Sequence, residues 1–237
     1  MLSSVGVWLS IVGQADREKA AVAVRHAVTA CAQRAGAGAV LSMLSARGVP
    51  EPVFATDRRS DRLEELQTTL GQGPCVEALT GNAPVLAEDL ANADTLGRWP
   101  ALAPAALERG VAAIFAVPVS SGAAQLGVLS LYRDRAGEQN ADEPEVWLLY
   151  ADAVLMLALD ARGGLAPGAV ELVGRGFTER RARVHQAAGM IAVQLGVSVT
   201  DALVALRARA YAEGQPILET AADVVARRLS FVPLEPT

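Results

Sequence analysis

The sequence is poor in the residues on which most enzyme and metal chemistry depends. Its 237 residues include two cysteines and two histidines, and aromatic residues make up 4%. Cys31 and Cys75 are widely separated and lack metal-ligand spacing, so we expect reduced thiols and no zinc site. The carboxylates Glu77, Asp89 and Asp94 have no histidine, lysine or second carboxylate at catalytic spacing. These absences predict that the protein is not an enzyme and holds no cofactor.

Long hydrophobic runs are also missing. The apolar run over residues 5–12 is too short to span a bilayer, and no basic region precedes it. We therefore expect no signal peptide, no transmembrane helix, no membrane partner and a cytoplasmic protein. Because 51% of the residues are hydrophobic, the chain has enough apolar side chains for more than one core.

An excess of positive charge is absent as well. The formal net charge is −5, divided into −6 for residues 1–170 and +1 for residues 171–237. A nonspecific nucleic-acid binder would have a strongly basic domain, so any such contact here must depend on a local cluster. Arg175, Arg180, Arg181 and Arg183 form one. They are either the solvated start of a helix or a binding cluster, and the second role is favoured because cations are unfavourable near a helix N-terminus.

Residues 15–160 alternate between helix and strand patterns. The spacing of apolar residues predicts helices over residues 16–35, 61–70, 99–109 and 141–162. Short apolar or alternating runs predict strands over residues 40–44, 53–56, 85–86, 114–119 and 126–132, with a hairpin turn at Arg47-Gly48.

The C-terminal part predicts a compact unit of three helices, none of which could bury its apolar stripe alone. Ser198 and Asp201 have the spacing of a capping box. The expected helices are bounded by Thr178 and Gly196, by Ser198 and Gly214, and by Pro216 and Pro233.

Three blocks of this unit resemble an ANTAR domain. They are the run Arg183-Val184-His185-Gln186-Ala187-Ala188-Gly189-Met190, the pair Leu206-Arg207 followed by Ala210, and the segment Ala221-Ala222-Asp223-Val224-Val225. The resemblance implies a three-helix RNA-binding module that acts in transcription antitermination. Ala188 departs from many relatives, which have lysine or glutamine there, and so removes one polar group from the expected surface.

The preceding part resembles a GAF domain. The resemblance covers about residues 15–160 and depends on Gly71-Gln72-Gly73-Pro74-Cys75 after a helix and on Leu126-Gly127-Val128-Leu129 in a late strand. It implies an antiparallel sheet between helices that often holds a small ligand. The expected fold is therefore α+β, with a GAF domain over residues 1–164 joined by a long helix to an all-α, three-helix ANTAR domain over residues 170–233.

Gly189 is the most informative residue of the expected RNA site. Glycine inside a helix costs about 1 kcal/mol relative to alanine. Its presence at this position therefore indicates that either another helix or an RNA backbone approaches closely. Arginine, glutamine and tyrosine side chains nearby supply phosphate contacts, base-edge hydrogen bonds and stacking. The predicted RNA-binding residues are Arg180, Arg181, Arg183, Gln186, Ala188, Gly189, Arg207, Arg209 and Tyr211.

Taken together, the two resemblances imply a transcription antitermination regulator that binds tandem hairpins in leader transcripts. It would act as a homodimer paired through residues 141–162, where Val146, Leu149, Ala153, Met156 and Leu157 form an apolar stripe. The alternatives are a GAF-type thiol redox enzyme, of the free methionine sulfoxide reductase sort, or a module that only senses a small molecule.

Two residues of the GAF part have competing interpretations. Cys75 is either a thiol whose pKa is lowered by a helix N-terminus or a small buried filler, and we expect the filler. Trp99 either lines a ligand pocket or anchors the core, and we expect the core.

Overall fold

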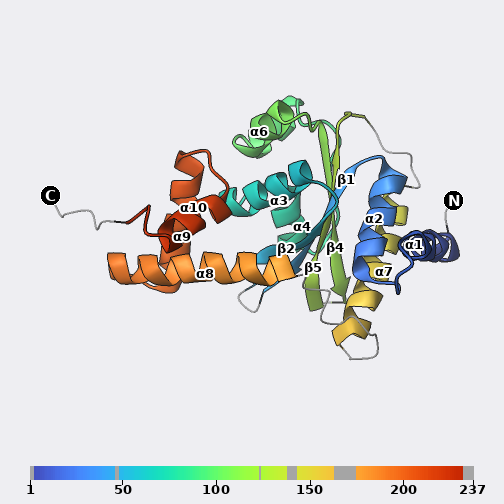
Figure 1. Ribbon diagram of the computed structural model, residues 1–237. Coiled ribbons are helices and arrows are strands. Elements are labelled where there is room, and N and C mark those ends of the chain that lie inside the picture. The colour runs from blue at the N-terminus through green and yellow to red at the C-terminus, as the bar shows by residue number, and fades with distance from the viewer. Residues whose placement is uncertain (1–2, 46–47, 123, 138–142, 163–174, 232–237) are drawn as a thin grey trace. The chain divides into compact units, whose positions relative to one another are not determined.

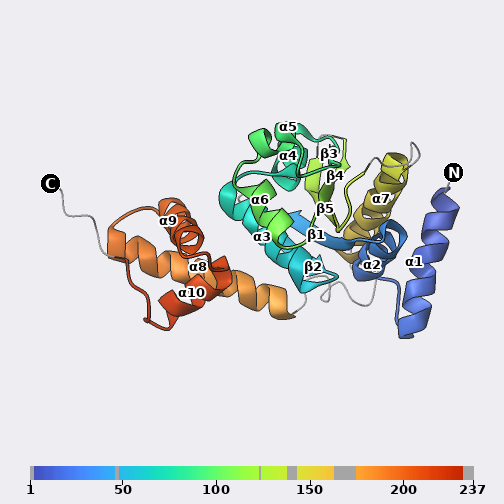
Figure 2. The ribbon, with the colours of Figure 1, turned by 90° about the horizontal axis from the view of Figure 1, so that it is seen from above.

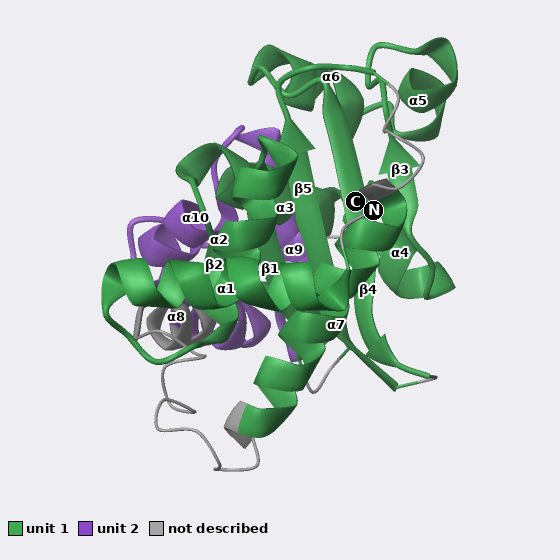
Figure 3. Ribbon diagram, turned by 90° about the vertical axis from the view of Figure 1, so that its right-hand side faces the viewer, with its two compact units in different colours: residues 1–172 green, residues 173–237 purple. Residues whose placement is uncertain are grey.

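The chain divides into two compact units, residues 1–172 and residues 173–237 (Figure 3). The computed structural model describes residues 3–45, 48–122, 124–137, 143–162 and 175–231. The domain boundary predicted between residues 164 and 170 lies outside this part of the chain. Unit 1 combines a sheet with helices, whereas the described residues of unit 2 form helices, so the α+β class is confirmed.

Unit 1 is built on a five-stranded antiparallel sheet with the strand order β2-β1-β5-β4-β3. Pro118 lies in β4 beyond the point where β3 stops pairing, so its missing N–H removes no hydrogen bond to that neighbour. The strands are β1 (Gly38–Leu44), β2 (Pro50–Ala55), β3 (Val85–Ala87), β4 (Ala113–Ser121) and β5 (Ala124–Arg133).

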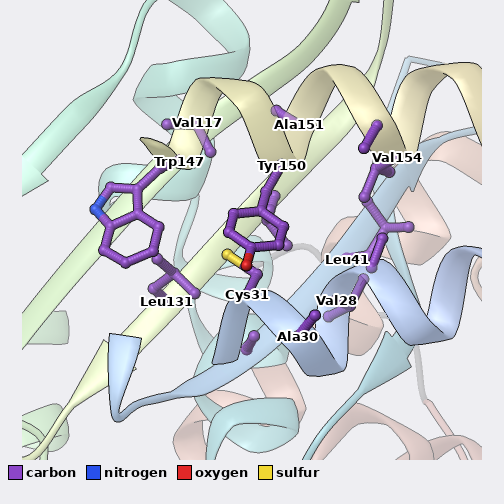
Figure 4. Packing of buried hydrophobic residues seen from close by; sticks show 14 of the residues in the cluster. Val28, Ala30, Cys31, Leu41, Val117, Leu131, Trp147, Tyr150, Ala151 and Val154 are labelled. Atoms are coloured by element: carbon purple, nitrogen blue, oxygen red, sulfur yellow. The ribbon is translucent and has the colours of Figure 1, made fainter. Parts of the chain in front are cut away.

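One face of the sheet is covered by α2 (Val24–Ala35) and α7 (Glu143–Arg162), with α1 (Ser4–Glu18) packed outside them (Figures 1 and 2). Large aromatic side chains of α7 fill the space between this helix layer and the strands (Figure 4). Trp147 and Tyr150 are almost completely buried there, and their rings stack with centroids 6.5 Å apart.

The other face is covered by α3 (Arg58–Leu70), α4 (Pro74–Gly81) and α6 (Leu102–Glu108), and α5 (Ala93–Arg98) precedes α6. Trp99 is 2% exposed in this second core, which confirms its predicted role. Its indole N–H donates a hydrogen bond of 2.7 Å to Glu77. The polar end of the ring is therefore satisfied while its body is buried.

The helix predicted over residues 16–35 is wrong, because α1 and α2 are separate helices. Lys19 adopts the left-handed conformation with φ 52°, and its N–H closes α1 on the carbonyls of Ala15 and Asp16. The backbone N–H of Ala23, at the start of α2, then donates to His26 Nδ1 at 3.0 Å. The predicted helix over residues 99–109 also begins later, at Leu102, and α5 was not predicted.

Unit 2 consists of α8 (Arg175–Leu195), α9 (Val199–Ala212) and α10 (Ile217–Val225). Ser198 caps α9 as predicted, accepting the backbone N–H of Asp201 at 3.1 Å. The third helix ends well before Pro233, since the chain turns left-handed at Arg227 with φ 58°. The buried core of the unit consists of Ala187, Ile191, Ala202, Leu206, Ala221 and Val224. Within the described residues of the chain, no helix is long and apolar enough to cross a membrane.

Candidate functional site

The outer face of α8 brings together several of the predicted RNA-binding residues. With about 100° of rotation per residue, Gln186 lies on the side of the helix opposite the buried Ala187, Ala188 and Ile191. Gln186 is exposed, as is Arg183 one turn before it. This face is the first candidate site, and it presents a cation and an amide from the same helix.

Gly189 lies on the same outer face and has open space beside it. A Cβ atom built at this position meets no atom within 4 Å outside its chain neighbours and the backbone of its own helix. The helix-contact alternative for this glycine is therefore wrong within the described structure. No packing contact among the described residues of unit 2 requires glycine at this position, so none of them compensates for the free-energy cost of glycine in the helix.

Not every predicted site residue reaches this surface. Ala188 is completely buried, so a ligand cannot contact it in this structure. The prediction that Ala188 belongs to the site is therefore wrong. Ala188 lies about 100° from Gly189 around α8 and faces inward. The side chains of Arg180 and Arg181 lie outside the described part of the chain.

The predicted residues of α9 divide between two sides of that helix. Tyr211 is 54% exposed, and Arg207 lies on the same side, about 40° away by helical rotation. Arg209 points about 160° from Tyr211, and its Nε donates to Glu213 at 2.6 Å. Tyr211 and Arg207 therefore share one side of α9, and Arg209, which is paired with Glu213, faces another.

Val193 belongs to the outer face of α8 but was missed by sequence reasoning. Its side chain is 84% exposed, and it lies two turns after Gln186 on the same stripe. An apolar residue at this spacing is easily attributed to a core. Only the observed burial of Ala187 and Ile191 on the opposite side shows that Val193 faces outward.

A second candidate site is buried in unit 1, around the carboxyl group of Glu64. Oε1 accepts hydrogen bonds from Ser42 Oγ at 2.6 Å and from Cys75 Sγ at 3.1 Å. Oε2 accepts from the Tyr132 hydroxyl and, at 3.4 Å, from Gln67 Nε2. All five side chains are completely buried. The carboxyl group therefore joins α3, α4, β1 and β5 through hydrogen bonds.

The segment Gly71-Gln72-Gly73-Pro74-Cys75 sets the geometry at the α4 side of this cluster. Gly73 has φ 120°, and a Cβ atom there would overlap Gln67 Oε1 and the Leu102 side chain. Pro74 then begins α4, where its missing N–H is not needed. The backbone N–H of Cys75 donates to Gln67 Oε1 at 2.9 Å, so the turn directs the Cys75 thiol toward Glu64.

Burial raises the pKa of Glu64 above its ordinary value, although hydrogen bonds from Ser42, Tyr132 and Cys75 oppose the shift. No group that donates to this carboxyl group in the described structure carries a positive charge. The protonated form is consequently favoured relative to an exposed glutamate. The cluster can hold a proton in the core, but its complete burial keeps it from any bulk substrate.

Cys75 is neither an activated thiol nor only a filler. Burial and then the negative charge of Glu64 raise its pKa well above the ordinary thiol value. The predicted alternative of a lowered pKa at the α4 N-terminus is therefore contradicted, because burial and the nearby carboxylate outweigh the helix. The thiol nevertheless has a specific role as a hydrogen-bond donor to Glu64.

The two cysteines lie on opposite faces of the sheet. Cys31 belongs to the core under α2 and α7, where Figure 4 shows it beside Tyr150, and burial raises its pKa. Cys75 packs on the other face with Ala116 and Val128. A disulfide between them is sterically impossible in the folded chain, since the sheet separates the two sulfur atoms.

We expect both thiols to resist modification in the native protein, because they are buried and disfavour the reactive thiolate. Titration with Ellman's reagent at neutral pH should detect almost no rapid reaction, and unfolding in guanidinium should expose two thiols per chain. Cys31→Ser and Cys75→Ser variants would assign any residual reaction. A rapidly reacting Cys75 in the native wild type would contradict this prediction.

Comparison with known proteins gives similarity in structure only. Neither protein-family models nor curated proteins match the sequence. One similar solved structure is the GAF domain of an Acinetobacter phosphoenolpyruvate-protein phosphotransferase, 12% identical, with a TM-score of 0.48 over 69% of this chain and 98% of that chain. The corresponding domain from Coxiella burnetii is 12% identical, with a TM-score of 0.47 over 68% and 98%. A type II free methionine-R-sulfoxide reductase from Thermoplasma acidophilum is 17% identical, with a TM-score of 0.41 over 56% and 91%.

Proposed function

We propose that the protein is a cytoplasmic, RNA-binding transcription antitermination regulator, with a GAF-type sensor unit followed by an ANTAR-type unit. The single observation that carries the proposal is the outer face of α8. Gly189 stands in mid-helix with open space beside it, and Gln186 and Val193 are exposed on either side. Together with the ANTAR resemblance of residues 183–190, this face fits the close approach of an RNA backbone.

The chemistry of unit 2 suits a hairpin loop better than a uniform duplex. A net charge of +1 over residues 171–237 supplies little general attraction to phosphate. Unpaired loop bases offer more, because they stack on aromatic rings and guanidinium planes and bond to amides along their edges. Tyr211, Arg207 and Gln186 provide these three groups. The proposed ligand is a pair of tandem hairpins in a leader transcript, bound by a homodimer, as the ANTAR resemblance implies.

A thiol redox enzyme is not favoured as a second function. Such chemistry needs an accessible thiolate, usually with a second thiol to complete the cycle. Here both thiols are buried with raised pKa values and lie on opposite faces of the sheet. For the sensor unit we propose regulation through the helices around Glu64, where side-chain hydrogen bonds of Ser42, Cys75 and Tyr132 with Glu64 connect α3 and α4 to the sheet.

Binding of tandem-hairpin RNA at two salt concentrations tests the proposal. We expect Arg183→Ala to weaken binding to every RNA in a panel, since a phosphate contact carries no sequence information. The slope of the logarithm of the binding constant against the logarithm of salt concentration should decrease by about 1. Gln186→Ala and Tyr211→Ala should mainly reduce the preference among loop sequences. The readout is fluorescence anisotropy of labelled hairpins.

Arg228→Ala is the matched control, because this exposed arginine of unit 2 pairs with Asp223 and belongs to none of the proposed contacts. Its RNA affinity should equal that of the wild type. Absence of binding to any tandem-hairpin RNA at low salt would refute the proposed function.

A further inference from the structure

Helix α4 packs on the sheet through small apolar side chains. Its Cys75, Ala78 and Leu79 form a buried cluster with Ala116 of β4 and Val128 of β5. The neighbouring helices α3 and α6 belong instead to a larger core that contains aromatic side chains. Because α4 has eight residues and buries little apolar surface, we expect it to open locally at a lower free energy than the rest of unit 1.

Side-chain hydrogen bonds hold both ends of α4. At the first turn, Cys75 donates from its thiol to Glu64 Oε1 at 3.1 Å and from its backbone N–H to Gln67 Oε1 at 2.9 Å. At the other end, Gln125 Nε2 donates to the carbonyl of Leu79 at 2.6 Å. The attachment of the first turn therefore depends on two polar side chains of α3, and one of them is a carboxyl group that can change its charge.

The surroundings of Glu64 stabilise its ionised form with hydrogen bonds but not with a positive charge. The titratable groups that face it among the described residues are Cys75 of α4 and Tyr132 of β5, and neither has a cationic form. Ser42 of β1 and Gln67 of α3 are uncharged donors. Burial has the largest influence on the pKa of Glu64 and raises it. Ionisation is therefore unfavourable in the closed structure, and contact with water would relieve this cost.

Ser130 gives a second reason for opening at the same place. Its hydroxyl group is buried close to Glu64 and Cys75, yet it makes no hydrogen bond of acceptable geometry within the described structure. A buried polar group without a partner destabilises the closed state. Movement of the first turn of α4 would admit water to both Ser130 and Glu64.

We infer that Glu64 is a proton-binding site that controls α4: the neutral carboxyl group keeps the first turn of α4 on the sheet, and its ionisation releases that turn. Gly71 and Gly73 precede the helix and can change backbone conformation at little steric cost. In the regulation proposed above for unit 1, on which this site depends, the proton is then the signal. The release of α4 itself requires no RNA.

Hydrogen exchange of the full chain without RNA, measured between pH 5 and pH 8, tests the release. After correction for the intrinsic exchange rate at each pH, α4 should be less protected than α2, which lies on the other face of the sheet. The closed state keeps a proton that the open state loses, so the protection of α4 should fall as pH rises, by at most about tenfold per pH unit.

Two variants assign this fall to one carboxyl group. In Glu64→Gln the protection of α4 should no longer fall with pH. Glu108→Gln is the matched control, because it changes an exposed glutamate at the end of α6, and its α4 should behave as in the wild type.

Alkylation of the two buried cysteines gives a second measurement in the same protein. Iodoacetamide labelling over hours, quantified for each cysteine by mass spectrometry, reports opening around Cys75 and around Cys31. The thiolate fraction of an exposed cysteine rises with pH at both positions, so the ratio of the two labelling rates isolates the effect of Glu64. The ratio of Cys75 to Cys31 labelling should rise with pH in the wild type and stay constant in Glu64→Gln.

Equal protection of α4 and α2 would mean that both exchange through unfolding of unit 1 as a whole, and it would overturn the inference. A wild-type α4 whose protection does not change with pH, or an equal fall in Glu64→Gln, would overturn it as well. The wild-type results can contradict the proton site even if Glu64→Gln does not fold. RNA binding by unit 2 is measured separately, so either proposal can fail without the other.

Discussion

Gly189→Leu is expected to abolish binding of hairpin RNA while unit 2 stays folded. A Cβ atom at position 189 has open space beside it in the described structure, so we expect a leucine side chain to be accommodated there without overpacking. If an RNA backbone approaches this face closely, the same side chain blocks it. Because leucine is a better helix former than glycine, the melting temperature of unit 2 should rise rather than fall.

Two further variants separate the loss of space from the change of helix propensity. Gly189→Ala should stabilise α8 by up to about 1 kcal/mol and weaken RNA binding less than leucine does. Ala226→Leu adds comparable bulk at an exposed position after α10 and should leave binding unchanged. Circular dichroism melting beside an anisotropy titration gives both quantities. Normal RNA binding by a folded Gly189→Leu protein would exclude the proposed face.

The elements with strong local patterns could be predicted from the sequence. The apolar runs over residues 114–119 and 126–132 form β4 and β5, and the Ser198 cap begins α9. Elements whose limits depend on tertiary contacts could not be predicted in this way. The break between α1 and α2 depends on Lys19 in the left-handed conformation, and no glycine or proline marks it in the sequence.

The polar cluster around Glu64 illustrates why a buried site is harder to predict. The buried side of α3 consists of Ser60, Leu63, Glu64 and Gln67, whereas apolar spacing would place Leu63, Leu66 and Leu70 inward. The partners of Glu64 come from β1, α4 and β5, at large separations in the sequence. The available signal is a serine in each of two central strands, Ser42 and Ser130, at positions that face the same side of the sheet.

For the same reason, the sequence could assign the residues of the proposed RNA site to helices but not to the exposed or buried sides of those helices. The residue types and the helix that carries them could be assigned, since Gln186 and Gly189 belong to a recognisable run in α8. The direction of each side chain could not be assigned, because it depends on which side of α8 the other helices cover. That choice buries Ala188 and exposes Val193. The pairing of Arg209 with Glu213 is different, because the two residues are i, i+4 neighbours on α9 and their spacing in the sequence already indicates it.

Glu64→Ala is expected to cost unit 1 several kcal/mol of stability. The change leaves the hydroxyls of Ser42 and Tyr132 and the thiol of Cys75 without their acceptor, and each unsatisfied buried group costs about 1–3 kcal/mol. Glu64→Gln should cost much less, because its carbonyl oxygen can still accept two of these hydrogen bonds. Denaturant unfolding at pH 5 measures both free energies.

The pH dependence of unfolding distinguishes a buried neutral acid from a merely structural polar residue. Burial raises the pKa of Glu64 in the folded chain above its ordinary value of 4.5, so the folded state keeps a proton that the unfolded state has lost. The contribution of Glu64 to stability is therefore fully present below that ordinary value and decreases as pH rises toward the folded pKa, by at most about 1.4 kcal/mol per pH unit. In Glu64→Gln this contribution disappears, and the difference in stability between pH 5 and pH 8 should shrink. Glu108→Gln is the matched control, because Glu108 is an exposed glutamate at the end of α6, and this variant should keep the wild-type difference in stability between pH 5 and pH 8. An unchanged pH dependence in Glu64→Gln would show that this carboxyl group is already ionised in the folded protein.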